Sequence, residues 1–393
     1  MTLHDTPAPA VALTFLVSPD GTVTLSGDLA LAPQEEQVLV SFLAPVGEVE
    51  RTPNAADVAA LVGMARRLAA DGFLRQVADR RFGLAGAIAP QPTAPSIPRK
   101  LAALDAFARL SRGCLDQVAA NARLLHQSGD AEALHQCRVG LRRLRATLTT
   151  FRQILPRDDL DRWKIEAGWL AGELEAAREL DALIAHVADS ATGPIRGDRS
   201  LTAFGERLVL ARALACDAAV EAIRSPRFTA LLLDFSEWLD EAPWLHKGDA
   251  KVARRARGHA SAVASEALDR LHGRLRKAGK HLGRLDPADR HKVRITAKKL
   301  RYAAEFFSET FGKSARKRQG KFVAALKGLL GALGELNDMT AAGPCARAVV
   351  GQHADLAFCA GVIVGRRNNR EPLLLAEAAH AYRQCFSARP FWA

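Results

Sequence analysis

One pattern of polar and apolar positions occurs twice along the chain. HQCRVGLRRLR begins at His135 and HKVRITAKKLR begins at His291, with polar residues at the histidine and three, seven, eight and ten positions after it. At about 100° per residue these positions span an arc of roughly 160° on an α-helix, and the apolar residues take the opposite side. The pattern therefore predicts two amphipathic helices, each with a cationic ridge and an apolar back.

Helical patterns fill almost all of the chain after residue 99, and glycine or proline residues interrupt them. The predicted helices cover residues 99–127, 131–154, 158–189, 200–223, 226–240, 250–282, 287–311, 314–340, 341–363 and 370–387. The low aromatic content of 6% agrees with packed helices better than with sheets. We therefore expect a mainly α fold.

The N-terminal part, residues 1–85, carries a different pattern. Segments 11–17 and 23–29 flank the turn-forming sequence Ser-Pro-Asp-Gly at 18–21, which predicts a β-hairpin. Two helices over 33–45 and 54–70 and a second hairpin over 73–77 and 80–84 would complete a small α+β module that resembles a winged helix. A packing module is the alternative, and the partner of this module stays unknown. Residues 86–98 are rich in Ala and Pro and are predicted to form a linker.

The repeat extends beyond the basic helix. LEAARELD at 174–181 follows the first copy, and LGELNDMT at 333–340 follows the second. The interval from position 135 to 291 nearly equals the interval from 174 to 333, so a single small insertion reconciles them. We therefore predict that a helical domain over 99–393 contains two related bundles, about 99–245 and 250–393. Packed with pseudo-twofold symmetry, these bundles would bring the two cationic ridges to one cleft.

Positive charge is concentrated in one region of the chain. The net charge is +12, yet residues 251–327 contain 22 Lys or Arg and 6 Asp or Glu, whereas residues 1–98 contain 6 and 10. Such a local field indicates a site for a negatively charged partner. The six cysteines are scattered and predict reduced core thiols, and no signal peptide or membrane-spanning stretch is visible. We therefore expect a soluble, cytoplasmic protein.

Four stretches of the chain resemble the conserved histidine α-helical domain (CHAD) family. They are LHQCRVGLRRLRATLTTFRQIL (134–155), SPRFTALLL (225–233), HKVRITAKKLRYAAEFF (291–307) and LGELND (333–338). The resemblance covers roughly residues 99–393. It implies two pseudo-symmetric antiparallel four-helix bundles around a basic central channel that binds inorganic polyphosphate, and it implies association with polyphosphate granules. Some relatives carry a triphosphatase strand with the pattern Glu-x-Glu-x-Lys, but EVERT at 48–52 lacks the lysine, so we expect no phosphohydrolase activity.

The resemblance also implies which side chains face the ligand. The matching positions are His135, Arg138, Arg142, Arg143, Arg145, His291, Arg294, Lys298, Lys299 and Arg301. Four more cations of the basic region are candidates to extend this track: Arg274, Lys277, Lys321 and Lys327. The 174–181 and 333–340 stretches match a second family signature, for which a structural role is equally compatible.

The chemistry of the ridges suits a polymer with a charge on every unit. Arginine offers paired donors to phosphate oxygens and lysine a mobile point charge, while each histidine either donates to phosphate or hydrogen-bonds a neighbouring helix. Surrounding cations disfavour a metal site, and we expect no cofactor, no metal and no catalytic residue. The alternative function is nucleic-acid binding or regulation through the ridges or the winged-helix-like module. The scarcity of aromatic residues, and the net charge of −4 over residues 1–98, argue against this alternative. An enzyme that acts on phosphorylated metabolites is a third possibility.

Overall fold

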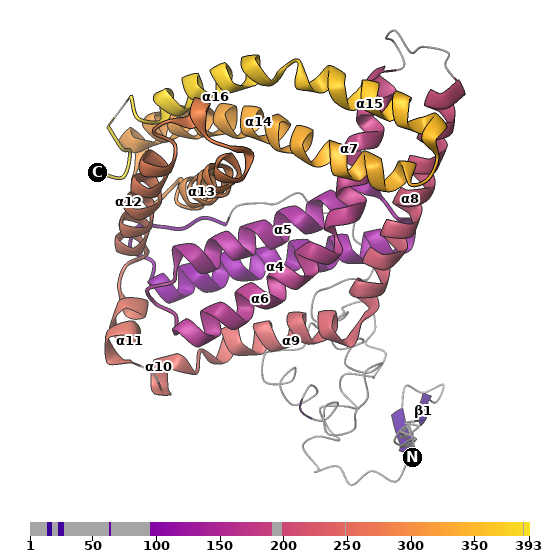
Figure 1. Cartoon of the computed structure of the whole chain (residues 1–393). Coiled ribbons are helices and arrows are strands. Elements are labelled where there is room, and N and C mark those ends of the chain that lie inside the picture. Colours follow the sequence, from indigo (N-terminus) through magenta and orange to yellow (C-terminus); the bar gives the residue numbers. More distant parts are fainter. Residues whose placement is uncertain are drawn as a thin grey trace, which may run out of the picture. The chain divides into compact units, whose positions relative to one another are not determined.

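The computed structural model describes residues 14–17, 23–26, 63, 95–190, 199–247, 249–387 and 389–393 (Figure 1). The described chain is mainly helical, as the sequence predicts. Its longer helices are α4 (Ala103–Ser128), α5 (Ala131–Thr150), α6 (Arg157–Glu173), α7 (Glu175–Ser190), α8 (Arg199–Arg224), α9 (Pro226–Glu241), α12 (Ala260–Ala278), α13 (Pro287–Phe306), α14 (Lys313–Val350), α15 (Ala354–Asn368) and α16 (Glu371–Cys385). The shorter elements are α10 (Trp244–Lys247), α11 (Ala250–Arg257) and the 3-10 helix η1 (Leu282–Arg284).

The chain divides into two compact units. Residues 89–223 and 243–393 form the unit that holds both predicted cationic helices, and residues 224–242, with helix α9, belong to the other unit together with residues 1–88. No described helix has the length and apolar character that crossing a membrane requires.

The first predicted hairpin is present. Strands β1 (Thr14–Val17) and β2 (Val23–Ser26) pair antiparallel, with Thr14 opposite Ser26 and Val17 opposite Val23. The remaining predicted elements of the winged-helix-like module lie outside the described residues, apart from the helical Gly63. Most of the 86–98 linker also lies outside them, so the domain boundaries at residues 85 and 98 stay predictions.

Helix α5 carries the first ridge and packs on α4, α6 and α7 (Figure 1). Gly129 ends α4 with a left-handed backbone (φ 62°), a conformation that glycine adopts with little strain. The Asp130 carboxylate then caps α5 by accepting a hydrogen bond from the Ala133 N–H at 2.7 Å. The close approach of α4 and α5 depends on Gly140, where a Cβ would lie 2.7 Å from a methyl of Val118. The first ridge is therefore held on a tightly packed helix pair.

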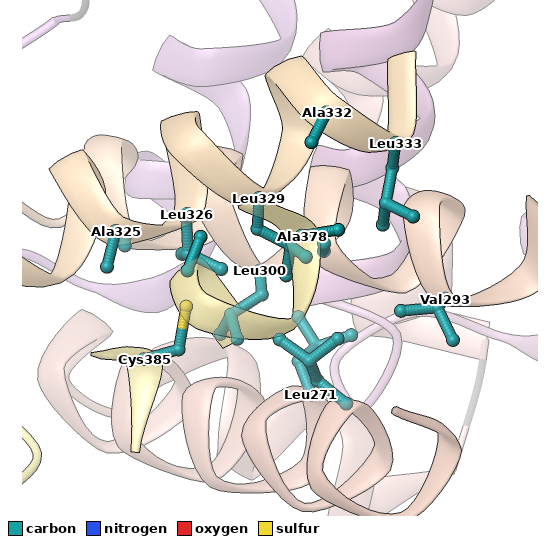
Figure 2. Close-up of a cluster of buried hydrophobic side chains, with 14 of the residues drawn as sticks. Leu271, Val293, Leu300, Ala325, Leu326, Leu329, Ala332, Leu333, Ala378 and Cys385 are labelled. Atoms are coloured by element: carbon teal, nitrogen blue, oxygen red, sulfur yellow. The ribbon is translucent and has the colours of Figure 1, made fainter. Parts of the chain in front are cut away.

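Helix α13 carries the second ridge and packs against α12 and α14. Asp286 caps its first turn, with Pro287 at the next position, where no N–H donor is lost. Its apolar back, including Val293 and Leu300, enters a core with residues of α12, α14 and α16, such as Leu271 and Leu329 (Figure 2). Because the apolar face of each ridge helix is buried in this way, its cationic residues are turned away from its core.

The two ridge helices also contact each other. Phe151 and Phe307 end α5 and α13, occupy matching positions of the repeat and are both fully buried. Their ring centroids lie 5.8 Å apart, and Phe107 of α4 extends the stack at 5.6 Å from Phe151. Aromatic pairs at such distances contribute about 0.5–1.5 kcal/mol beyond their buried area. This contact fixes where the ends of the two ridges lie relative to each other.

Three predictions of where a helix breaks are wrong. The predicted helix 158–189 breaks at Leu174 into α6 and α7, and the predicted helix 250–282 breaks at Gly258 into α11 and α12. At the second break the Gly258 carbonyl accepts from the Ala103 N–H at 2.7 Å, a partner distant in sequence.

The third error lies in α14, which runs unbroken through the predicted boundary at 340 and contains Pro344. A proline inside a helix costs about 3 kcal/mol. Here it is offset by burial of Ala342, Ala346 and Val349 in a core shared with α7, α8 and α15.

Candidate anion-binding site

A pocket of about 380 Å³ opens where α5, α7, α13 and α14 meet. Seven Arg or Lys side chains and three carboxylates face it, so the formal charge of its lining is positive. The charged and polar lining residues are His135, Arg138, Arg142, Glu175, Arg178, Glu179, Arg294, Lys298, Arg301, Tyr302, Lys327, Asn337 and Asp338.

Both copies of the repeat contribute matching positions to this pocket. Arg138 and Arg142 of the first ridge correspond to Arg294 and Lys298 of the second, and all four side chains line it. When the second signature is aligned from Leu174 and from Leu333, positions 178, 179, 182 and 183 correspond to 337, 338, 341 and 342, and all eight line it as well. The pocket is therefore assembled from equivalent faces of the two repeats.

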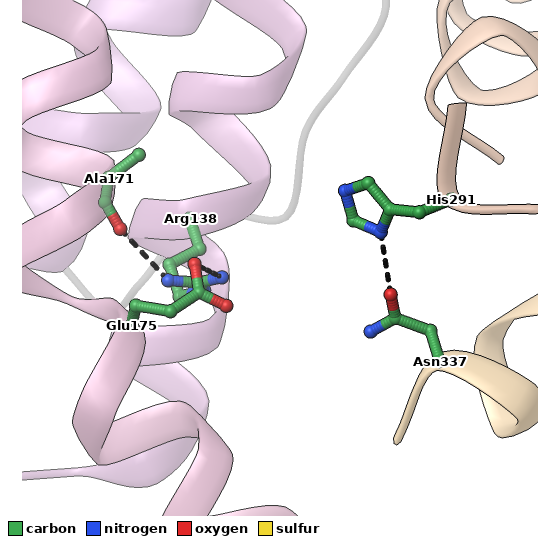
Figure 3. A network of polar contacts seen from close by, with 5 residues as sticks. All are labelled: Arg138, Ala171, Glu175, His291 and Asn337. Atoms are coloured by element: carbon green, nitrogen blue, oxygen red, sulfur yellow. Dashed lines mark hydrogen bonds and ion pairs between the residues drawn. The ribbon is translucent and has the colours of Figure 1, made fainter. Parts of the chain in front are cut away.

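The guanidinium of Arg138 is already engaged. Its Nη1 donates to the Ala171 carbonyl at 3.0 Å, and its Nη2 donates to Glu175 Oε2 at 2.7 Å (Figure 3). The Arg138 side chain is only 11% exposed, whereas that of Glu175 is 53% exposed, so solvent screens the pair from one side. This ion pair orients Arg138 toward the pocket while leaving its Nε without a partner among the described residues.

The two motif histidines have different surroundings. The Nδ1–H of His291 donates to the amide oxygen of Asn337 at 2.6 Å, which links α13 to α14 at the edge of the pocket (Figure 3). Burial, together with the neighbouring Arg142, lowers the pKa of His135, so its neutral form is favoured. His291 thus has a hydrogen-bonding role between helices, and His135 lines the pocket itself.

Lys298 is the most perturbed cation of the pocket. Burial, and then the charges of Arg294, Arg142 and Arg138, lower its pKa to about 7, although Asp338 acts in the opposite direction. Burial also lowers the pKa of Arg294 and raises that of Glu179. These directions share their largest cause, burial, since each charged form is poorly solvated in the pocket; repulsion between like charges adds to it.

Seven of the fourteen predicted residues do not line the pocket. Arg143 instead lies against the ring of Phe306, with its guanidinium carbon 5.8 Å from the centroid. His291 stands at the edge, and Lys277 and Lys321 are exposed on α12 and α14.

The remaining three predicted residues, Arg145, Lys299 and Arg274, belong to a second group of cations that we call the Lys299 cluster. Its members come from α5, α6, α12 and α13 and from the residues just after α5, and they are Arg145, Arg152, Lys164, Arg270, Arg274 and Lys299. Burial, followed by the charges of Arg145, Lys164 and Arg274, lowers the pKa of Lys299. Burial, followed by Arg152 and Arg274, lowers the pKa of Arg270 to about 10.

The predicted site lacks five charged or amide residues of the pocket. They are Glu175, Arg178, Glu179, Asn337 and Asp338. The sequence carries a signal for them, because all five belong to the second signature of the repeat, for which a structural role is equally compatible. No three His, Cys, Asp or Glu side chains of the described chain gather in a way that could hold a metal ion.

The chain belongs to the CHAD domain family, whose model matches residues 109–347, more than half of the sequence. A crystal structure of the CHAD domain from the plant Ricinus communis is similar, with 25% identity and a TM-score of 0.65, over 77% of this chain and 98% of that one. PptA from Streptomyces chartreusis shares the fold at 21% identity and a TM-score of 0.53, over 72% of this chain and 100% of that one. None of the curated proteins matches the chain.

Proposed function

We propose that this protein binds inorganic polyphosphate through the pocket and performs no chemistry on it. The observation that carries the proposal is that Arg138 and Arg142 of one ridge face the same pocket as Arg294 and Lys298 of the other. Four cations from two helices offer donors to several phosphates at once. The family of the chain adds support, because the resemblance of its motifs implies the same ligand.

The energetics of the pocket favour a highly charged anion. Lys298 and Arg294 lose solvation there and lie close to other cations, which lowers the pKa of both. The Nε atoms of Arg142 and Arg294 are buried and have no partner among the described residues. Phosphate oxygens would accept hydrogen bonds from these Nε–H groups and offset the repulsion between the cations. Binding would therefore reduce the free-energy penalty that the pocket has without a ligand.

A polymer could extend beyond the pocket. A ridge from its histidine to the tenth residue after it is about 15 Å long, enough to contact several phosphates. The Lys299 cluster supplies six further cations, of which Arg145 and Lys299 belong to the two ridges. We therefore expect long polyphosphate to bind more tightly than tripolyphosphate, and binding to weaken steeply with added salt through counterion release.

A four-residue substitution tests the proposal. Arg138, Arg142, Arg294 and Lys298 changed together to Ala should weaken binding of long-chain polyphosphate at least about 100-fold, because four charge-assisted contacts are removed. The matched control replaces four exposed basic residues of α11 by Ala and so removes the same number of basic side chains. Its residues are Lys251, Arg254, Arg255 and Arg257.

Fluorescence anisotropy with labelled polyphosphate measures both variants, and circular dichroism checks their helical content. Equal losses in the two variants would mean that net charge alone causes binding, and the pocket would then have no specific role. Duplex DNA added at equal phosphate concentration tests the nucleic-acid alternative, because displacement of polyphosphate would favour it. Phosphate release from tripolyphosphate with Mg²⁺ or Mn²⁺ would instead indicate an enzyme.

Two broader aspects belong to the same proposal. Polyphosphate binding would direct a cytoplasmic protein to polyphosphate granules. Fluorescence imaging tests this by comparing the location of a fluorescent fusion of the wild type with that of the four-residue variant. The helical region would consist of two pseudo-symmetric four-helix bundles, a description that the contact between Phe151 and Phe307 supports.

A further inference from the structure

Lys298 combines three features that bear on its reactivity. It lines the pocket, so small molecules can reach it, and no other lysine of the second ridge does so. Among the described residues its amine has no hydrogen bond or ion pair, unlike Lys292, which pairs with Asp289 at 2.7 Å. Arginines of both ridges surround it.

We infer that Lys298 is a modification site at which small acyl phosphates transfer their acyl group to the amine. The inference rests on the anion-binding role proposed above, since the same arginines would hold the phosphate of the reagent. Arg294 and Arg301 flank Lys298 at one turn on either side along α13, and Arg142 faces it from α5. A phosphate bound among them brings the adjacent acyl carbon next to the amine, which raises its effective concentration.

The reaction balances without any further reagent. The neutral amine attacks the carbonyl carbon, a C–N bond forms, and the bond between the acyl carbon and the bridging oxygen breaks. Inorganic phosphate leaves with the electron pair and takes up the proton of the amine. The guanidinium groups stabilise the charge that gathers on the departing phosphate. The product is an uncharged amide, which cannot be protonated as the amine can. The modification would therefore lower the affinity of the pocket for polyphosphate.

Electrostatics support this chemistry. The lowered pKa of Lys298, about 7, leaves about 90% of its amine neutral at pH 8, against less than about 1% for an ordinary lysine. A desolvated lysine beside other cations is a known form of activated nucleophile. The charged or titratable groups that face the same pocket are Arg294, Arg301 and Tyr302 of α13, His135, Arg138 and Arg142 of α5, Glu175, Arg178 and Glu179 of α7, and Lys327, Asp338 and Cys345 of α14.

The test treats the full chain with acetyl phosphate at pH 7, 8 and 9 and measures acetylation at each lysine by quantitative peptide mass spectrometry. Lys298 should react at least about tenfold faster than the exposed Lys317. This advantage is smaller than the ratio of the neutral fractions of the two amines, because a less basic amine is also a weaker nucleophile. The rate at Lys298 should level off above pH 7, whereas that at Lys317 should keep rising. Equal rates at the two lysines would refute the inference.

Two comparisons separate guided transfer from simple reactivity. An acetyl N-hydroxysuccinimide ester has no phosphate, so Arg294→Gln should slow the reaction of Lys298 with acetyl phosphate more than its reaction with the ester. In the wild type, tripolyphosphate should protect Lys298 and leave Lys317 unaffected. If acetyl phosphate and the ester show the same preference for Lys298 and tripolyphosphate does not protect it, the phosphate does not guide the reaction and the inference fails.

Binding of long-chain polyphosphate, measured separately on the unmodified protein, keeps this inference distinct from the proposed function. Tight binding with no selective acetylation overturns the modification site and leaves the binding proposal standing. Selective, protected acetylation without binding of the long polymer supports the modification site and overturns the polyphosphate proposal.

Discussion

Replacing Lys298 by Met should stabilise the protein, by an amount that depends on pH. The substitution keeps a side chain of similar length and removes a charge that is poorly solvated and surrounded by cations. In the folded protein the pKa of Lys298 is about 7, compared with the ordinary value of 10.5. Between these two values the unfolded chain binds more protons than the folded one, so the stability of the wild type rises with pH.

The difference in pKa sets the magnitude. At pH 7 the shift corresponds to a penalty on the free energy of folding of the order of 4 kcal/mol, and at pH 9 to about 2 kcal/mol. This free-energy penalty is fully present below pH 7 and disappears as the pH approaches 10.5, the pKa of the lysine in the unfolded chain. The stability of the Lys298→Met variant relative to the wild type should therefore decrease by about 2 kcal/mol between pH 7 and pH 9.

Urea unfolding followed by circular dichroism, in a buffer without phosphate or other polyvalent anions, measures both proteins at the two pH values. Only the change of the difference with pH matters, because altered packing at the substituted position contributes equally at both. Lys317→Met, at an exposed lysine, is the control and should show no such change. A difference between wild type and Lys298→Met that stays constant within about 0.5 kcal/mol would refute the lowered pKa.

Four further outcomes are expected. The affinity of the wild type for polyphosphate, measured by anisotropy, should fall by up to about 50-fold between pH 7 and 9, because binding favours the protonated amine of Lys298. The Lys298→Met variant should lack this contribution to the pH dependence of the affinity. Glu175→Gln should raise the affinity several-fold, because it removes a pocket carboxylate that competes for Arg138, and an unchanged affinity would contradict this role. Leu300→Ala, at a fully buried position, should lower the free energy of unfolding by about 2–5 kcal/mol in urea titrations. Gly140→Ala should cost about 1–3 kcal/mol in the same assay, and full tolerance would show that α4 and α5 can separate.

The amino-acid sequence alone was sufficient to predict both ridge helices and where they begin. Helical periodicity determines which residues share a face, and Asp130 and Asp286 mark the starts of α5 and α13 because a carboxylate at that position accepts from a free N–H. The mainly α fold and the family follow from the same local information. The duplicated motifs also indicated that both ridges would serve one site.

The tertiary structure decided which members of each ridge share the pocket. Arg145 and Arg301 occupy the same position of the repeat, yet only Arg301 lines the pocket, while Arg145 joins the Lys299 cluster. Periodicity describes a helix face relative to its own axis and carries no information about the neighbour that covers it. The unbroken course of α14 past Pro344 has the same origin, because burial of nearby side chains outweighs the local preference for a break.

The lowered pKa of Lys298 likewise depends on burial and, after Arg294, on Arg142 and Arg138, which belong to the first repeat and lie far earlier in the chain. A sequence identifies a lysine, but its solvation and the charges around it exist only once distant helices have packed.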